Sequence, residues 1–581
     1  FRPAMKRGLS PAGPDGGVAR VQRPSVPALE LGAALQTGWL SRKRHRHIGV
    51  AGGSRRAPRS ASTSSTLALT AAQRAVVGLV REGSSLFLTG AAGTGKSEVL
   101  RALASRGGVS VAVTALTGSA AVLLGGQTLH AWAGIGRADL PADVLAQRVL
   151  QDASAHERWC STSLLIVDEV SMVSGSLLDK LDAVGRAARR QPKKAFGGLQ
   201  VLFCGDFHQL PPPGVHTEGW AFEARCWNTL VETVVELTEV VRLEAGELAF
   251  ARVLEQVRSG SVDDEAWSAL GRLVVPPAAA QTDRGCIDGA THLVPTNAEA
   301  DKVNKAALQQ LFTRASAAQV GQPTARTDVT DDPSDQRMVE FIAQSVGPRD
   351  SSRAAFCAPT SSAGAPATLN LGVGAQVVLT QSLCLGPDKD GLTGSAWGDW
   401  ALCTASHIRA FENEPGVQER LTNGTRCQVV GFCHLADRLY DPRAAGFEGA
   451  ELSLPLRRFL LKHGGLLPRV AVPGAARDYV VYPVASGGGG ADSGLVQLPL
   501  RLGWALTVHR AQGMTLSACV VHLRGISSSG QAYVALSRCR RASQLRILGG
   551  LPERNPRTGR VAAFAPAKKV AEFYAALGRA E

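Results

Sequence analysis

Three features that mark common protein classes are scarce or absent in this chain of 581 residues. Its 11 cysteines contain no CxxC pair and no zinc-binding spacing, which favours free thiols in a reducing compartment. No apolar run could cross a membrane, because the uncharged stretch 354–386 is interrupted throughout by Pro, Ser, Thr, Asn and Gln. Acidic side chains are scarce at the start, where residues 1–66 hold twelve Lys and Arg but only Asp15 and Glu30.

The basic character of the chain is therefore concentrated in its first 66 residues. Most of the formal net charge of +14 belongs to this segment, so the total charge is a weak indicator of nucleic-acid binding. Its Arg, Ser, Pro and Gly content, without apolar periodicity, predicts a disordered basic tail. The composition is typical of an organellar transit peptide, whereas the basic run 41–47 equally fits a nuclear signal, a phosphate contact or a merely solvated tail. We expect a mitochondrial or nuclear location, with a plastid as the alternative, and a natural start upstream of Phe1.

The most specific motif is GAAGTGKS at residues 90–97, directly after the apolar run 86–89. This is the spacing of a P-loop, in which glycines allow successive backbone N–H groups to converge on phosphate oxygens. Lys96 would supply positive charge to the β and γ phosphates, and Ser97 would offer a hydroxyl to Mg²⁺. A helix over residues 98–104 would point its positive end at the same anion. The residues predicted to bind the nucleotide are Gly90, Ala91, Ala92, Gly93, Thr94, Gly95, Lys96 and Ser97.

Two further apolar runs lead into polar residues suited to phosphate chemistry. Residues 164–167 are followed by Asp168 and Glu169, and the run 199–205 is followed shortly by Gln209. Hydrolysis that depends on Mg²⁺ needs one carboxylate to orient the hydrated metal and a second to polarise the attacking water. The amide of Gln209 could sense the γ-phosphate. These positions predict a nucleoside triphosphatase.

Short apolar strands alternate with helical stretches after the tail, which predicts an α/β fold with parallel sheets covered by helices. The first helix is expected over 69–81. Runs of β type over 370–433 predict a small barrel, and the α/β pattern returns at 498–548, so the barrel is expected to be an insertion. The polar stretch from about 314 to 366 predicts a loop or a disordered insert.

A series of motifs follows the order found in superfamily 1 DNA helicases. Over residues 67–548 the chain resembles the Pif (petite integration frequency) family, which is related to RecD. Besides the P-loop, the motifs are LTAAQ (69–73), TALTGSAA (114–121), GQTLHAWAGIG (126–136), DEVSM (168–172), WALTVHRAQGMT (504–515) and GQAYVALSR (530–538). The segments that favour this family over RecD itself are AFEARCW (221–227), LTEVVR (237–242), LGVGAQVVL (371–379) and LTNG (421–424).

The resemblance implies two RecA-like P-loop NTPase domains, with a small SH3-like β-barrel inserted in the second. In each RecA-like domain a parallel sheet is flanked by helices. The expected boundaries are a tail over 1–66, the first RecA-like domain over 67–230, the second over 231–369 and 498–550, the SH3-like insert over 370–497, and a C-terminal helical tail over 551–581.

The resemblance also implies roles in ATP binding and hydrolysis. Gln73 would read the adenine and so favour ATP. Asp168 would support the Mg²⁺ ion, and Glu169 would activate the attacking water. Lys96 would serve catalysis as well as binding, because it neutralises charge on the transferred phosphate.

Three more residues are implied to couple hydrolysis to movement. Gln209 would link the γ-phosphate to a shift between the domains. Arg538, from the second domain, would act as an arginine finger, and Arg242 as a second one. A finger supplied across a cleft stabilises developing charge only when the cleft closes, which is what a motor requires.

The implied partner is single-stranded and forked DNA, gripped by its backbone without sequence preference. No membrane partner is expected, and the protein is expected to translocate as a monomer. Trp132 is left with two interpretations, a base-stacking residue or a core residue. The implied DNA-binding residues are Thr117, Gly118 and His130 on the first domain and His509, Gln512 and Thr515 on the second.

The resemblance therefore implies an ATP-dependent 5′→3′ DNA helicase acting in DNA replication, repair, recombination or telomere maintenance. The polarity comes from the resemblance alone. Two alternatives stay open: a DNA-stimulated ATPase switch that does not unwind, and an RNA helicase.

Overall fold

The structure is a computed structural model, and the residues it describes run from 69 to 578 with gaps. The described ranges are 69–105, 110–136, 138–239, 247–276, 289–319, 338–346, 366–380, 383–385, 400–403, 420–421, 424–434, 459, 461–473, 478–481, 483–487, 494–555, 557–558 and 560–578. Within these ranges, none of the helices is both long enough and apolar enough to cross a bilayer. The expected disordered tail over 1–66 lies outside the described residues.

The first sheet has six parallel strands in the order β3-β2-β4-β5-β1-β6. Its strands are β1 (Leu86–Gly90), β2 (Val111–Ala115), β3 (Gln127–Thr128), β4 (Leu164–Asp168), β5 (Gln200–Cys204) and β6 (Thr233–Leu237). The central strands are apolar and fully buried, as strands covered on both faces must be. Because all strands run the same way, the loops that follow β1, β4 and β5 meet at one edge.

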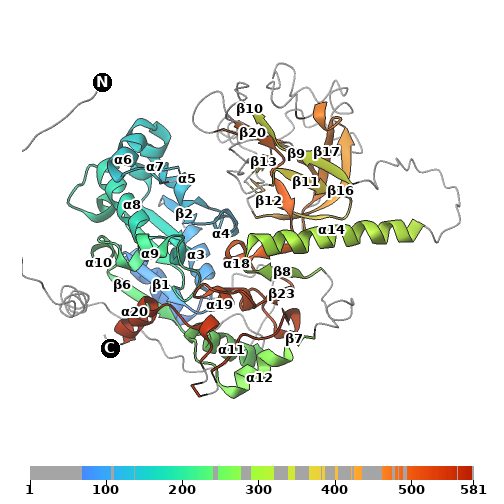
Figure 1. The fold of residues 1–581 in the computed structure, drawn as a ribbon. Coiled ribbons are helices and arrows are strands. Elements are labelled where there is room, and N and C mark those ends of the chain that lie inside the picture. Colours follow the sequence, from blue (N-terminus) through green and yellow to red (C-terminus); the bar gives the residue numbers. More distant parts are fainter. Residues whose placement is uncertain are drawn as a thin grey trace, which may run out of the picture. The chain divides into compact units, whose positions relative to one another are not determined.

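Helices lie against this sheet (Figure 1), and they are mostly short. They are α2 (Ala71–Arg81), α3 (Lys96–Ala104), α4 (Gly118–Leu123), α5 (Leu129–Ala133), α6 (Ala142–Gln151), α7 (Ala153–Ser161), α8 (Gly175–Ala188), α9 (Val215–Glu218) and α10 (Trp227–Leu230). The helix expected over 69–81 is confirmed as α2. Thr70 starts it with a capping box, since its hydroxyl accepts from the Gln73 N–H while the Gln73 side chain accepts from the Thr70 N–H.

The second sheet has five parallel strands in the order β22-β8-β23-β24-β7. Its strands are β7 (Val274–Val275), β8 (Thr291–Val294), β22 (Ala505–Thr507), β23 (Cys519–His522) and β24 (Leu545–Leu548). The helices of this part are α11 (Leu248–Ser259), α12 (Asp264–Arg272), α14 (Asn297–Gln319), α18 (Val508–Ala511) and α19 (Gln531–Leu536). The expected α/β class with two parallel sheets is confirmed.

Between β8 and β22 the chain forms β structure with its own buried core. An eight-stranded sheet has the order β15-β13-β14-β18-β17-β16-β12-β21. Of two smaller sheets, one pairs β9 with β11, and the other has the order β10-β20-β19. The strands are β9 (Val339–Ile342), β10 (Gln344–Val346), β11 (Thr368–Leu371), β12 (Gln376–Leu379), β13 (Leu383–Leu385), β14 (Trp400–Cys403), β15 (Arg420–Leu421), β16 (Arg426–His434), β17 (Leu466–Ala471), β18 (Asp478–Val480), β19 (Val484–Gly487), β20 (Gly494–Gln497) and β21 (Leu500–Leu502). An inserted β domain is thus present, and its SH3-like character stays a prediction.

Two expected boundaries differ from the structure. β6 pairs with β1 along its whole length, so the first domain extends past the expected end at residue 230. The stretch from 314 to 366 is not wholly an insert, because α14 continues to Gln319 and β9 and β10 lie within it. Both strands pair with segments far along the chain, β9 with β11 and β10 with β20, which polar composition could not reveal. The remainder of that stretch lies outside the described residues.

The C-terminal helix α20 (Lys568–Gly578) packs against the first sheet, although it follows the second sheet in the chain (Figure 1). Phe573 stacks on Phe222 with ring centroids 4.5 Å apart. The hydroxyl of Tyr574 lies 2.8 Å from the Thr89 hydroxyl and accepts the N–H of Phe207 at 3.2 Å. The helical tail expected over 551–581 therefore contains a helix that completes the core of the first domain.

Phe573→Ala should destabilise the first domain by about 3 kcal/mol, because it removes a buried ring that is 4% exposed. Urea unfolding followed by tryptophan fluorescence measures the effect. Glu572→Ala is the matched control on the same helix, since the Glu572 side chain is 63% exposed and its change should cost less than about 0.5 kcal/mol. Equal losses for the two variants would contradict the docking of α20.

Candidate functional site

The P-loop joins β1 to α3 and has the backbone geometry that its glycines predict. Gly90 has φ +143°, and a Cβ there would lie 2.4 Å from the Leu237 carbonyl oxygen, so no larger residue fits. Gly95 has φ +82° and starts α3 in the left-handed region. The Lys96 ammonium donates to the carbonyl oxygens of Gly90 at 2.7 Å and Ala91 at 3.0 Å. The lysine thus lies across its own loop, where a phosphate would compete for it.

Asp168 and Glu169 stand at the end of β4, beside the P-loop. Glu169 has φ +55°, a left-handed conformation that turns the chain directly after the strand. One carboxylate oxygen of Asp168 accepts the Glu169 N–H at 2.9 Å. Loss of hydration and, to a lesser extent, the neighbouring charge of Glu169 raise the pKa of Asp168 to about 7. A carboxyl with this pKa takes up either a proton or a metal cation.

Gln209 follows β5 and reaches the same edge of the sheet. Its side chain is 5% exposed, and its Oε1 atom is buried without a hydrogen-bond partner among the described residues. An unpaired buried amide oxygen is costly, so this group is suited to a ligand or a water. Gly530, at the start of α19, packs against the Gln209 backbone, since a Cβ on Gly530 would lie 2.2 Å from the Gln209 carbonyl oxygen.

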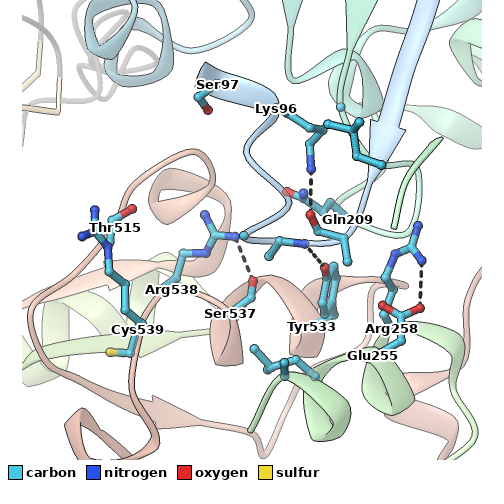
Figure 2. Close-up of a pocket in the computed structure, with 18 of the residues that line it drawn as sticks. Lys96, Ser97, Gln209, Glu255, Arg258, Thr515, Tyr533, Ser537, Arg538 and Cys539 are labelled. Carbon is cyan, nitrogen blue, oxygen red and sulfur yellow. Dashed lines mark hydrogen bonds and ion pairs between the residues drawn. The ribbon is translucent and has the colours of Figure 1, made fainter. Parts of the chain in front are cut away.

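These residues line a cavity of about 570 Å³ between segments of the two sheets (Figure 2). The Tyr533 hydroxyl, from α19, accepts the N–H of Ala92 in the P-loop at 2.8 Å. Tyr533, from a helix of the second domain, therefore accepts a backbone N–H that would otherwise donate to a phosphate oxygen. The lining residues used here are Ala92, Lys96, Ser97, Asp168, Glu169, Gln209, Arg258, Thr515, Tyr533, Arg538 and Cys539.

Arg538 lies in the cavity wall, and its guanidinium is held by hydrogen bonds to its own part of the chain. Within the described residues its guanidinium donates only to its own neighbourhood, to Val534 O at 2.7 Å, Met514 O at 3.1 Å, Ser537 Oγ at 2.8 Å and, most weakly, Ala511 O at 3.5 Å. It is 6% exposed, and this burial lowers the pKa of Arg538. For the expected finger role the side chain must leave some of these carbonyls.

A buried ionic cluster behind Gln209 was not anticipated from the sequence. Asp206 is fully buried and accepts from Arg258 of α11 at 2.8 Å and from the His208 backbone at 3.1 Å. Burial alone would raise the pKa of Asp206, but the charges and hydrogen bonds of Arg258 and His208 together outweigh burial and hold this pKa far below its usual range. Tyr574 of α20 completes the cluster, with its hydroxyl 3.3 Å from Asp206 and its ring stacked on His208 at 4.4 Å. The loop that carries Gln209 is therefore fixed by two segments distant in the chain.

The sequence analysis did not identify Tyr533 or Arg258 as site residues, and only Tyr533 lies in a motif that could have indicated it. Tyr533 lies inside the motif GQAYVALSR, so the motif offered a signal for it. Arg258 lies in an ordinary amphipathic helix, and nothing in its sequence context marks it. Its significance comes only from the ion pair with Asp206.

The three expected DNA contacts on the first domain lie along the carboxyl edge of its sheet. Thr117 and Gly118 follow β2 and begin α4, where the Thr117 hydroxyl accepts the Ala120 N–H at 3.3 Å. His130 follows β3 on α5, and burial lowers its pKa. Trp132 belongs to the core: it is 2% exposed, with its ring 4.6 Å from that of Trp159.

The three expected DNA contacts on the second domain occupy different environments. His509 is exposed on α18. Gln512 is fully buried and donates to the Glu169 carboxylate at 2.8 Å and to the Ser171 hydroxyl at 3.1 Å. Thr515 lines the cavity that contains the P-loop. Gln512 is therefore covered in this structure, and a DNA contact by its side chain would require this segment to move.

Two expected nucleotide residues remain untested. Gln73 lies beside the P-loop, but its amide is already engaged, donating to Thr94 O at 3.2 Å and accepting from Thr70 N at 2.9 Å. Adenine recognition by Gln73 stays a prediction. Arg242 lies outside the described residues.

Comparison with known proteins identifies the family of this chain. The profile of the PIF1-like helicase family matches residues 68–267. The human ATP-dependent DNA helicase PIF1 is 33% identical over 481 residues, which are 82% of this chain and 60% of the human protein. The chain belongs to the PIF1-like helicase family. It spans about 60% of the length of the curated relatives that it matches.

Solved structures of the same family share the fold of this PIF1-like chain. The crystal structure of the Pif1 helicase from Candida albicans is similar with a TM-score of 0.62 at 29% identity, covering 88% of this chain and 100% of that one. Bacteroides Pif1 bound to single-stranded DNA is similar with a TM-score of 0.56 at 22% identity, covering 88% and 97%. The expected pair of RecA-like domains is thereby confirmed.

The raised pKa of Asp168 gives the PIF1-like chain a specific pH dependence. The folded carboxyl holds its proton up to about pH 7, whereas the unfolded one loses it near its ordinary value, so the free energy of unfolding falls as the pH rises between these values. Between pH 5 and pH 7 the loss should be about 2 kcal/mol. Asp168→Asn should remove this part of the pH dependence, measured by urea unfolding at both pH values.

The control for this measurement is Glu98→Gln, a surface carboxyl paired with Arg101. In this variant the free energy of unfolding should differ between pH 5 and pH 7 by as much as in the unaltered protein. If the free energy of unfolding of Asp168→Asn differed between pH 5 and pH 7 as it does in the unaltered protein, the raised pKa of Asp168 would be refuted.

Proposed function

We propose that this chain is an ATP-dependent 5′→3′ DNA helicase that translocates on single-stranded DNA and unwinds forked duplexes. The observation that carries the proposal is the single cavity lined by the P-loop and Asp168 of one sheet and by Tyr533 and Arg538 of the other. A site shared between two domains changes when they move. Strand polarity, action as a monomer and a role in genome maintenance rest on family membership.

The substrate proposed for the cavity is ATP with Mg²⁺. The chemistry of the residues fits this ion, because Ser97 offers a hydroxyl and Asp168 is a carboxyl with a raised pKa in the same cavity. When bound, the ion would neutralise charge on the β and γ phosphates. Lys96 would turn from its own loop carbonyls to the phosphates, and Gln73 would contribute to choice of the base.

In this proposal the chain's own residues divide the chemistry of hydrolysis. Glu169 accepts the proton of the attacking water, and the unpaired Oε1 of Gln209 orients that water or senses the γ-phosphate. Arg538 leaves its backbone carbonyls and reaches the developing charge when the cavity closes, with Arg242 as a second finger. Turnover is thereby tied to the distance between the two sheets.

The route from DNA to the cavity is proposed to run through the segment that contains Gln512. Its amide holds the Glu169 carboxylate, while His509 three residues earlier is exposed. A DNA strand that shifts this segment would release or reposition the residue proposed to activate water. Thr117, Gly118 and His130 would hold the strand on the other domain through its backbone.

A strand-displacement assay tests the proposal. The protein should open a duplex with a 5′ single-stranded tail and leave a 3′-tailed duplex intact. ATPase stimulation by DNA without displacement of either duplex would indicate a switch instead. Stronger stimulation by single-stranded RNA than by DNA would indicate an RNA helicase.

Lys96→Ala should lower the ATPase rate by about 10²-fold or more, because the positive charge at the phosphates is lost. DNA binding, measured by fluorescence anisotropy without nucleotide, should persist, since five of the six expected DNA contacts, all but Thr515, are not among the residues that line the cavity. Lys180→Ala is a control, because Lys180 donates to the Ala138 carbonyl away from the loop. Substantial hydrolysis by Lys96→Ala would refute the assignment of the P-loop.

Arg538→Ala should retain ATP binding while turnover falls by about 10³-fold, as expected for a finger that acts on the transition state. Binding of a fluorescent ATP analogue and steady-state hydrolysis separate the two effects. Arg546→Ala is the control in the same domain, since Arg546 donates only to local carbonyls within the described residues. Equal losses of affinity and turnover would argue against a finger.

A further inference from the structure

Two buried thiols lie in contact next to the proposed arginine finger. The Sγ atoms of Cys519 and Cys539 are 3.1 Å apart, and the side chains are 0% and 3% exposed. Cys519 is the first residue of β23, and Cys539 directly follows Arg538. Theirs is the only hydrogen bond between two thiols within the described part of the chain.

The two thiols differ in their surroundings. Cys539 is among the residues that line the nucleotide cavity (Figure 2), and it is 3% exposed. Cys519 lies behind it in the core of the second domain. Their shared hydrogen bond lowers the pKa of Cys539 and raises that of Cys519, because the thiol that keeps its proton stabilises the neighbouring thiolate. The more accessible sulfur is therefore also the more reactive one.

We propose that Cys519 and Cys539 form a reversible disulfide that restrains Arg538 and so regulates ATP hydrolysis. The bond itself requires only the two thiols and a peroxide. The regulatory effect rests on the proposed function, because it needs Arg538 to move during turnover.

The oxidation balances with hydrogen peroxide as the oxidant. The Cys539 thiolate attacks one peroxide oxygen, the O–O bond breaks, and a sulfenic acid and hydroxide form; the hydroxide takes up the thiol proton as water. The Cys519 thiol then attacks the sulfenic sulfur, the S–S bond forms, and the second oxygen leaves as water. Two sulfurs lose two electrons in total, and the peroxide gains them. A dithiol reductant reverses the reaction through a mixed disulfide.

The geometry explains both the ease of the bond and its effect. A disulfide is about 2.05 Å long, so the sulfurs need to approach by about 1 Å. The new bond would attach the residue after Arg538 to β23, and the Arg538 carbonyl already accepts the N–H of Leu516, three residues before that strand, at 3.0 Å. The finger's backbone would then be held both by β23 and by the segment that leads into it. Its side chain would have less freedom to leave the carbonyls of Val534 and Met514.

The test treats the full chain with hydrogen peroxide and compares it with the reduced protein. Mass spectrometry of peptides should find Cys519 linked to Cys539. DNA-stimulated turnover should fall about tenfold, part of the ~10³–10⁵-fold that a finger contributes, while KM for ATP changes much less. Dithiothreitol should restore turnover.

Cys519→Ala cannot form the bond and should keep its turnover in peroxide. Cys519→Val is the second variant, used if the alanine variant does not fold. Cys427→Ser, a buried cysteine of the inserted β domain, should respond to peroxide as the unaltered chain does.

Absence of the linked peptides would overturn the proposal, and so would a linked protein with full turnover. Equal inhibition of Cys519→Ala would also overturn it, since the sensitive thiol would be another one. If the reduced protein shows no DNA-stimulated ATPase, the proposed function fails instead, and peptide mapping still decides whether the disulfide forms.

Discussion

Acidic side chains gathered at the carboxyl edge of the first sheet are the constraint on which the rest of the structure depends. Parallel strands bring Asp168, Glu169 and Asp206 to this edge, and burial penalises each charge that lacks a partner. Asp206 is paired with Arg258, and Glu169 accepts from Gln512, both from segments after the first sheet. Asp168 makes no ion pair within the described residues, and its pKa is raised instead. The edge is therefore completed partly by the second domain and partly by what the cavity binds.

In the proposed function, this arrangement would make one short segment responsive to two ligands. Gln512 holds the Glu169 carboxylate from the second domain. Gly513 beside it packs against Ala120, which closely follows two expected DNA contacts, Thr117 and Gly118. A phosphate in the cavity and a nucleic-acid strand near α18 would each change the position that this segment prefers. Two ligands that bias the same two-state element are coupled, and the coupling is reciprocal. The coupling follows from contact alone and needs no long pathway.

Sequence spacing predicted the parts of the site that a single strand determines. A polar residue at the end of a buried parallel strand, or a few residues after it, lies at the carboxyl edge, so Asp168, Glu169 and Gln209 could be placed in advance. The side-chain direction of Gln512 and the pairing of Arg258 with Asp206 could not, because both depend on how two domains pack. Strand pairing across long gaps was also hidden, because no local pattern marks the partner of a strand, and the first domain was therefore expected to end before β6.

If the chain binds ATP as proposed above, the contacts of α19 imply an order of events. The Tyr533 hydroxyl accepts the Ala92 N–H, a neutral hydrogen bond at an amide where a phosphate oxygen is expected. A hydrogen bond to a charged acceptor is roughly twice as strong as a neutral one, so the phosphate displaces the tyrosine. Arg538 lies on the same short segment, held only by backbone carbonyls and a serine hydroxyl within the described residues. Loss of the Tyr533 contact therefore frees the segment just as an anion appears that can attract Arg538, and nucleotide binding itself prepares closure.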